Sequence, residues 1–227
     1  DGSGVLYDPE GLDRTELKKL VQQKTMIEKY DPSKLSEKGY KILVTENDIT
    51  LKDGYFIESG MNYRNQFCLN PQFAGDLFVP CGGRPQTINI SNVHKLFDAN
   101  GKARIKYIVE GANLFFTQDA RLVLEKAGVV LYKDASANKG GVTSSSMEVL
   151  AALSLSNEEF EEHMQVKDGK IPQFYNNYVQ DVIQKIKRNA RLEFQCIWDE
   201  YKKTGIPRAV LTDILSKKIN ELNYSMQ

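Results

Sequence analysis

The sequence is poor in cysteine and histidine, has no excess of either charge, and contains no long apolar run. Its 227 residues include three cysteines, Cys68, Cys81 and Cys196, and two histidines, and no pair among them has the spacing of a zinc site. An odd and sparse set of cysteines is typical of a reducing compartment. Thirty basic residues balance thirty acidic ones, which gives no reason to expect nucleic acid as a partner. No stretch approaches the roughly 20 apolar residues of a membrane span, so we expect no membrane contact.

A second absence concerns dinucleotide binding. In the fold that binds dinucleotides, a G-x-G-x-x-G motif follows the first strand, and an acidic residue about 20 positions further on ends the second strand. The sequence has no such motif, because neither Gly82-Gly83 nor Gly140-Gly141 fits it. If the chain has this fold, its first strand and phosphate loop lie before Asp1. We then expect an incomplete Rossmann-like parallel sheet that lacks its first strand.

The middle of the chain repeats one pattern three times. Apolar runs at 76–80, 105–109 and 128–132 each lead into a loop rich in glycine or asparagine. We expect helices after these loops, near 90–97, from a Thr117 cap to Lys126, and from Gly141. The alternation predicts an α/β fold with parallel strands, whose carboxyl ends bring the three loops to one edge of the sheet.

The segments before and after this repeated pattern have other features. Asp13 and Glu16 have the spacing of a capping box for a first helix, and Lys52-Asp53-Gly54 indicates a hairpin within an insertion at about 36–75. Towards the C-terminus an apolar stripe predicts a long helix over 175–201, and Pro207 suits the start of a final helix. We expect core packing for both, with the buried face of the final helix formed by Leu211, Ile214, Leu215, Ile219 and Leu222. The predicted division is a partial cofactor-binding domain at 1–155 and a helical segment at 156–227.

Two features of the loops could carry chemistry. Gly140-Gly141 precedes four hydroxyl residues at a helix start, where free N–H groups would suit a carboxylate, although the same residues also fit a plain loop with capping hydroxyls. Asn113 and Asn138 follow adjacent strands, where an amide can both donate and accept. They suit the carboxamide and ribose of a nicotinamide, and equally the ordinary role of asparagine in turns.

Four segments together resemble a known family. VLYDPEGLD (5–13), LFVPCGGRPQTIN (77–89), KYIVEGANLFFTQDAR (106–121) and KDASANKGGVTSSSMEVLA (133–151) are similar to the C-terminal half of glutamate dehydrogenases, above all the large NAD-dependent type of fungi. The resemblance implies that L-glutamate is oxidatively deaminated to 2-oxoglutarate and ammonia with NAD as the cofactor. We expect the parent protein to be a homo-oligomer, and both the cytoplasm and the mitochondrial matrix fit as its compartment.

The resemblance assigns roles to single positions. Val142 and Ser145 match the residues that meet the substrate, Ser145 through its hydroxyl at the side-chain carboxylate. An acid at Asp1 would favour NAD over NADP, because it would repel a 2′-phosphate. The positions that match cofactor contacts are Asp1, Ser3, Pro80, Cys81, Asn113 and Asn138.

The resemblance also implies what the chain lacks. The catalytic lysine and aspartate of the family belong to a substrate domain upstream, so we expect no catalytic residue in this chain and no activity from it alone. Two alternatives stay open. One is a structural α/β module used for assembly, which would not need Asn113, Asn138 and Ser145 to converge on one cleft. The other is a dehydrogenase for another amino acid, which would want an apolar pocket where Ser144 and Ser145 stand.

Overall fold

A computed structural model describes residues 1–225. The chain forms two compact units, Asp1–Ala74 and Gly75 onward, which are described separately. In the first unit the strands are β1 (Gly4–Tyr7), β2 (Tyr40–Leu43), β3 (Asn47–Thr50) and β4 (Phe56–Ser59). Its helices are α1 (Arg14–Gln22), α2 (Gly60–Gln66) and the short 3₁₀ turns η1 (Ile27–Lys29), η2 (Pro32–Lys34) and η3 (Phe67–Leu69).

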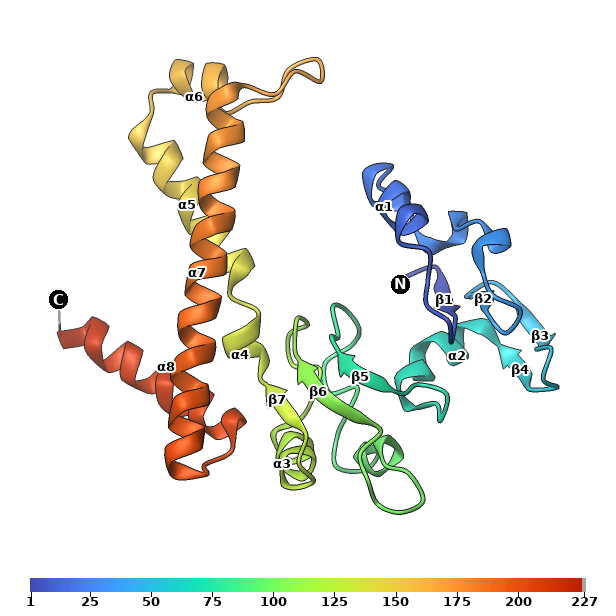
Figure 1. Ribbon diagram of the computed structural model, residues 1–227. Helices are drawn as coiled ribbons and strands as arrows, with labels where there is room; N and C mark the ends of the chain where they lie inside the picture. Colours follow the sequence, from blue (N-terminus) through green and yellow to red (C-terminus); the bar gives the residue numbers. More distant parts are fainter. Residues whose placement is uncertain (226–227) are drawn as a thin grey trace. The chain divides into compact units, whose positions relative to one another are not determined.

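The first unit contains two antiparallel strand pairs, β1 with β2 and β3 with β4 (Figure 1). The β3–β4 pair confirms the hairpin predicted around Asp53-Gly54. Val5, Ile42, Ile57 and Tyr63 form the core that holds the pairs and α2 together. The predicted insertion at 36–75 therefore contains ordered strands and helices that belong to this small core.

Helix α1 begins as predicted, but only half of the expected capping box is present. The Asp13 carboxylate accepts a hydrogen bond from the backbone N–H of Glu16 at 2.8 Å. The backbone N–H of Asp13 donates to the hydroxyl of buried Tyr30 at 3.0 Å, and the Glu16 carboxylate pairs with Lys19 at 3.2 Å. A tertiary contact thus takes the place of the local bond that the spacing suggests.

The second unit is built on a three-stranded parallel sheet in the order β5-β6-β7, which confirms the α/β fold class (Figure 1). The strands are β5 (Gly75–Phe78), β6 (Ile105–Val109) and β7 (Val130–Tyr132). The helices are η4 (Val93–Leu96), α3 (Gln118–Lys126), α4 (Asp134–Ala137), α5 (Gly140–Ser154), α6 (Asn157–His163), α7 (Gln173–Thr204) and α8 (Arg208–Ser225). The side chains of Ile88, Ile108, Phe116, Leu124 and Leu131 are almost completely buried around the sheet.

The helix expected at 90–97 shrinks to the single 3₁₀ turn η4. The Asn92 side chain accepts from the N–H of Asn89 at 2.8 Å and donates to the carbonyl of Thr87 at 2.9 Å. Asparagine side chains that bond to nearby backbone offer it an alternative to helix, which explains the short turn.

Helices α7 and α8 form the predicted C-terminal helical segment. The last turns of α7 and the first turns of α8 pack on the sheet. Tyr132 of β7, Ile197 of α7 and Leu211 of α8 share one buried cluster. Gly205, at φ +69°, ends α7 in the left-handed conformation that glycine adopts without strain. In the part of the chain that the structure describes, no helix is long and apolar enough to cross a membrane.

The prediction that one face of α8 is buried along its whole length is wrong. Leu211 is buried, but Ile219 is 41% and Leu222 is 59% exposed. Figure 1 shows the cause, because α8 leaves α7 at an angle and its second half extends away from the sheet. The apolar stripe therefore continues past the surface it covers.

The compact units divide the chain at a different place from the predicted domains. The residues before Gly75 pair with one another, whereas in the second unit α8 packs on α3 and β7, and α7 packs on α4 and α8. The predicted boundary at 155, between a partial cofactor-binding domain and a helical segment, stays a prediction.

Candidate functional site

The loops that follow the three parallel strands lie close together, as parallel topology requires. Pro80 and Cys81 follow β5, and Gly111 follows β6. A Cβ atom on Gly111 would lie 3.1 Å from the Cys81 Sγ and 3.2 Å from the Pro80 carbonyl oxygen. The absence of a side chain at Gly111 therefore lets the first two loops touch. Pro80 is buried there, and Cys81 is exposed.

The two asparagines singled out from the sequence meet across the second and third loops. The Asn138 Nδ2 donates to the Asn113 Oδ1 at 2.5 Å. Among the described residues, the Asn113 Nδ2 and the Asn138 Oδ1 have no other hydrogen-bond partner. The pair thus retains a donor and an acceptor that a ligand could use.

A cleft of about 790 Å³ opens beside this pair, between the loops and one side of α5. Its lining combines polar groups with exposed apolar side chains, and it holds four of the predicted site residues. The lining residues are Asn113, Asn138, Gly141, Val142, Ser145, Ser146, Val149 and Leu150. A concave site of this size with a few convergent polar groups suits a small ligand.

The hydroxyls at the start of α5 divide into two kinds. Thr143 donates to the carbonyl of Lys139 at 2.9 Å, and Ser144 donates to the carbonyl of Gly141 at 2.8 Å. Ser145 and Ser146 line the cleft instead. Since neither bonded hydroxyl accepts from a helix N–H, the structure does not use them as the capping groups that the plainer interpretation requires.

A buried ionic network lies beneath the loops, and the sequence reasoning missed it. Arg121 of α3 contacts the Glu110 carboxylate through Nε and Nη2, both at 2.8 Å, and its Nη2 is 3.4 Å from the Asp134 Oδ1. All three side chains are nearly inaccessible to solvent. Burial raises the pKa of Glu110, and the adjacent Arg121 opposes that rise. A charged residue at the end of the apolar run 105–109 was the available signal.

Asp1 and Ser3 belong to the first unit and organise their own loop. The Asp1 carboxylate accepts from the N–H and the hydroxyl of Ser3, both at 2.8 Å, and from the N–H of Ile27 at 3.0 Å. The Ser3 hydroxyl accepts from the N–H of Glu28 at 3.2 Å. Contact of these two residues with a ribose stays a prediction. Across residues 1–225, no cluster of three His, Cys, Asp or Glu could hold a metal ion.

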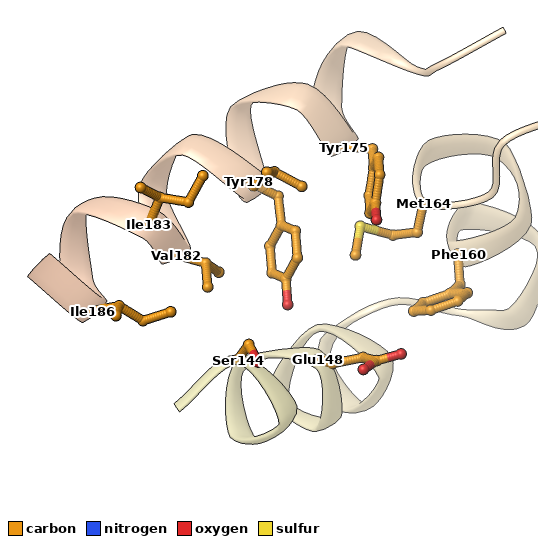
Figure 2. A pocket seen from close by; sticks show the side chains of 10 residues that line it. Ser144, Glu148, Phe160, Met164, Tyr175, Tyr178, Val182, Ile183 and Ile186 are labelled. Atoms are coloured by element: carbon orange, nitrogen blue, oxygen red, sulfur yellow. The ribbon is translucent and has the colours of Figure 1, made fainter. Parts of the chain in front are cut away.

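A second cavity of about 420 Å³ lies among α5, α6 and α7, and none of the predicted site residues line it. Figure 2 shows Tyr175 and Tyr178 of α7 pointing towards α5, with Ser144 and Glu148 opposite them. Glu148 is the sole charged side chain in its described lining, and the remaining walls are mostly apolar. The two cavities use different residues of α5, so this helix has open space on two of its faces.

Parallel strands with a cleft at their carboxyl ends define an α/β protein whose candidate site lies where open parallel sheets bind ligands. The family model described as Glutamate/Leucine/Phenylalanine/Valine dehydrogenase matches residues 1–205. The chain belongs to this family.

Several relatives match along the entire chain, among them two from Dictyostelium and Neurospora. One is Glutamate dehydrogenase 2 of Dictyostelium discoideum, 56% identical over 227 residues, which cover 100% of this chain and 22% of that protein. The other is the NAD-specific glutamate dehydrogenase of Neurospora crassa, 52% identical over 228 residues, with 100% and 22% covered. The chain thus spans about a fifth of the length of these relatives. The predicted resemblance to NAD-dependent glutamate dehydrogenases is confirmed.

Among solved structures, the crystal structure of Plasmodium falciparum glutamate dehydrogenase is similar, with a TM-score of 0.56. The match covers 100% of this chain and 40% of that one, at 18% sequence identity. At this identity the similarity concerns the fold.

Proposed function

We propose that this chain forms the nicotinamide side of the active site in an enzyme that oxidatively deaminates L-glutamate to 2-oxoglutarate and ammonia with NAD. The observation that carries the proposal is the convergence of Asn113, Asn138 and Ser145 on one cleft, in a member of this dehydrogenase family. A module used for assembly alone would not need these three residues to meet, so the geometry favours the enzyme.

The free atoms of the asparagine pair fit a nicotinamide carboxamide. That group offers one acceptor oxygen and one donor nitrogen, which complement the Asn113 Nδ2 and the Asn138 Oδ1. NAD, when bound, supplies the acceptor for the hydride, and the protein orients it. Asn113 and Asn138 would hold the ring, while the exposed side of Cys81 and the backbone of Pro80 would border it.

The start of α5 fits the substrate. Ser145 lines the cleft, and the first N–H groups of α5 favour a negative charge at this end of the helix. We place the side-chain carboxylate of glutamate here, with Val142 packing against its methylenes. The apolar residues Val149 and Leu150 extend the same wall of the cleft.

General acid–base catalysis must come from residues outside this set. No charged side chain lines the described cleft, and proton transfer by a positioned group contributes roughly 10²- to 10⁴-fold to enzymatic rates. We therefore propose that a lysine and an aspartate elsewhere in the gene product supply it, and that residues 1–227 alone are inactive.

Calorimetric titration of NAD and NADP into the full gene product tests the cofactor assignment. Loss of one neutral hydrogen bond costs about 1.4 kcal/mol, so Asn138→Ala should weaken NAD binding about tenfold. Asn189→Ala, an exposed asparagine on α7, is the matched control and should leave the affinity unchanged. Equal affinity of the wild type and Asn138→Ala would contradict the assignment.

Thiol labelling provides an independent test at pH 8. Cys81 and Cys196 are both exposed, so both should react readily, and saturating NAD should protect Cys81 alone. Cys68 serves as the slow reference, because burial raises its pKa to about 11 and leaves only about one thiolate in a thousand. Unchanged labelling of Cys81 in the presence of bound NAD would remove this residue from the cofactor site.

The substrate assignment is tested by Ser145→Ala. We expect the KM for glutamate to rise about tenfold, the cost of one hydrogen bond, while the affinity for NAD stays the same. A panel that includes leucine, valine and phenylalanine decides between glutamate and the other substrates of the family. Faster turnover of an apolar amino acid would favour the alternative dehydrogenase.

We further propose that the parent protein is a homo-oligomer. The support is α8 from Ile214 onward, where the apolar side chains of Ile214, Ile219 and Leu222 are 38%, 41% and 59% exposed. Light scattering on a sizing column should show a multimer that Ile219→Glu converts to a smaller species. An unchanged mass would exclude this surface from assembly.

The proposed compartment is the cytoplasm or the mitochondrial matrix. The support is that all three cysteines are free thiols. Cell fractionation with an antibody to the gene product tests this, and recovery in a secreted fraction would contradict it.

A further inference from the structure

We propose that Asp134 is a positioning residue that sets the orientation of both site amides, and that Arg121 and Glu110 hold it in place. The inference rests on the proposed function, because it concerns the two asparagines assigned to the cofactor. Asp134 itself is buried beneath the loops and does not line the described cleft. Its effect on a ligand must therefore pass through Asn113 and Asn138.

The first connection runs through Leu114. The Asp134 Oδ2 accepts a hydrogen bond from the backbone N–H of Leu114 at 2.7 Å. Leu114 has a φ of +56°, a left-handed conformation that leucine rarely adopts. Backbone strain of this kind persists where surrounding contacts impose it. The adjoining residue is Asn113, so the bond from Asp134 sets the direction from which its side chain leaves the loop.

The carbonyl side of Leu114 is held as well. Its oxygen accepts from the backbone N–H of Gln86 at 2.7 Å, in the loop that follows β5. Both backbone groups of this strained residue therefore have short hydrogen bonds. Loss of the Asp134 bond would release the side of the loop that faces the third strand.

The second connection runs through the backbone of Asp134 itself. Its carbonyl oxygen accepts from the N–H of Asn138 at 2.8 Å, and its Oδ1 accepts from the N–H of Ala135 at 2.8 Å. These bonds define the single turn α4 that leads into Asn138. One residue thus fixes the backbone at Asn138 and at the neighbour of Asn113, whose side chains then bond to each other.

Arg121 and Glu110 hold the Asp134 carboxylate in its orientation. Arg121 contacts Asp134 at 3.4 Å and is held from the other side by two bonds to Glu110. Glu110 is anchored in turn, because its N–H donates to the carbonyl of Tyr132 in β7. A buried network in which each group has partners resists rearrangement. Arg121 is therefore also a positioning residue, which acts on the two site amides through Asp134.

A double-mutant cycle on NAD affinity in the full gene product tests the proposal. Asp134→Ala should weaken NAD binding about tenfold, and Asp134→Asn, which retains an acceptor for the Leu114 N–H, should recover most of the loss. In the Asn113→Ala/Asn138→Ala background, Asp134→Ala should add less than about twofold, because coupled residues are not additive. If Asp134→Ala weakened NAD binding as strongly in this background as in the wild type, the proposal would be overturned.

The control is Glu125→Gln, a buried carboxylate on α3 that contacts the start of α8. It should lower the denaturation midpoint without changing the affinity for NAD. A comparable loss of affinity in this variant would show that NAD binding reports general stability, and the positioning role of Asp134 would then fall.

A further measurement separates this inference from the proposed function. Hydrogen exchange of the Leu114 amide should accelerate about a hundredfold in Asp134→Ala, while the Ile108 amide in the centre of the sheet keeps its protection. This readout needs no cofactor. If the wild type binds no NAD, the proposed function fails, yet accelerated exchange at Leu114 would still show that Asp134 holds the loop. Unchanged exchange at Leu114 would overturn the positioning role whatever the affinity for NAD.

Discussion

Two buried arginines in the second unit serve opposite ends of the same sheet. Arg121 lies beneath the loops of the candidate site and forms a two-pronged bond to Glu110. Arg208, the first residue of α8, has its Nε 3.2 Å from a Glu125 oxygen, donates to the Val129 carbonyl at 2.9 Å and stacks over Tyr201 at 4.1 Å. Both side chains are almost fully buried, at 4% and 3% exposure.

The carboxylates beside these arginines differ in the backbone N–H groups from which they accept hydrogen bonds. Asp134 accepts from the N–H of Leu114, within a loop that leads to an asparagine of the cleft. Glu125 accepts from the N–H groups of Arg208 and Ala209, at 2.8 and 3.0 Å, and so caps α8. The same interaction therefore supports a loop of the candidate site in one place and anchors a helix in the other. The difference shows that burial of an ion pair does not by itself indicate function.

The largest expected effects come from removal of either arginine. Arg121→Met and Arg208→Met should each lower the free energy of unfolding by about 3–5 kcal/mol, because each leaves buried carboxylate charge uncompensated. Urea denaturation measures the loss, and NAD titration separates the pair, since only Arg121→Met should also weaken binding. Equal binding defects in both variants would erase the distinction between the two networks.

The dependence on pH sharpens the comparison. Burial raises the pKa of Glu110 and of Glu125 above the ordinary 4.5, so the folded state retains protons that the unfolded chain releases. Each group therefore costs stability as the pH rises above about 4.5, and the cost disappears below that value.

Loss of Arg121 should raise the pKa of Glu110 further, at about 1.4 kcal/mol per pH unit. The penalty of Arg121→Met should therefore be larger at pH 7 than at pH 5. The penalty of Arg208→Met should change less, because two backbone N–H groups still lower the pKa of Glu125. Urea titrations at both pH values measure these losses of unfolding free energy. An equal loss for Arg121→Met at pH 5 and pH 7 would contradict the role of Arg121 in lowering the pKa of Glu110.

A neutral contact links the two regions and should matter less. The hydroxyls of Ser136 in α4 and Thr212 in α8 lie 2.9 Å apart in a buried position. Thr212→Val should cost about 1 kcal/mol of unfolding free energy, the net value of one hydrogen bond plus the unpaired partner. Calorimetric melting provides the measurement, and Thr204→Val, on the exposed end of α7, is the control. A cost above that of Arg208→Met would reverse the proposed ranking.

The smallest effect is expected at Tyr132. Its hydroxyl is buried and has no hydrogen-bond partner in the described structure, and burial raises its pKa to about 12. Tyr132→Phe removes an unsatisfied group, so the free energy of unfolding should stay within about 0.5 kcal/mol or increase. Denaturation of this variant beside Thr212→Val checks the order, and a clear loss of stability would reveal a partner for the hydroxyl.

Much of the fold and the cleft could be predicted from local sequence. The three apolar runs became the parallel strands, Thr117 caps α3, and Gly205 ends α7. The convergence of Asn113 and Asn138 followed from parallel topology, which brings the ends of adjacent strands together. The roles assigned to the single site residues came from family resemblance and stay predictions.

The rest depends on contacts between distant residues. The sequence around Asp134 looks like an ordinary helix start, and only the structure shows its bond to Leu114, twenty residues away. The exposed second half of α8 was unpredictable for a related reason. Periodicity defines which side chains share a face, but it carries no information on how far the neighbouring surface extends.

The cap on α8 has a consequence for the order of folding. The two N–H groups that donate to the Glu125 carboxylate lie 83 and 84 residues further along the chain. A loop of that length must close before the first turn of α8 gains its partner, and distant contacts of this kind form slowly. Helix α8 should therefore dock late in folding, on a sheet that is already assembled. Its docking would then indicate that the rest of the unit has folded.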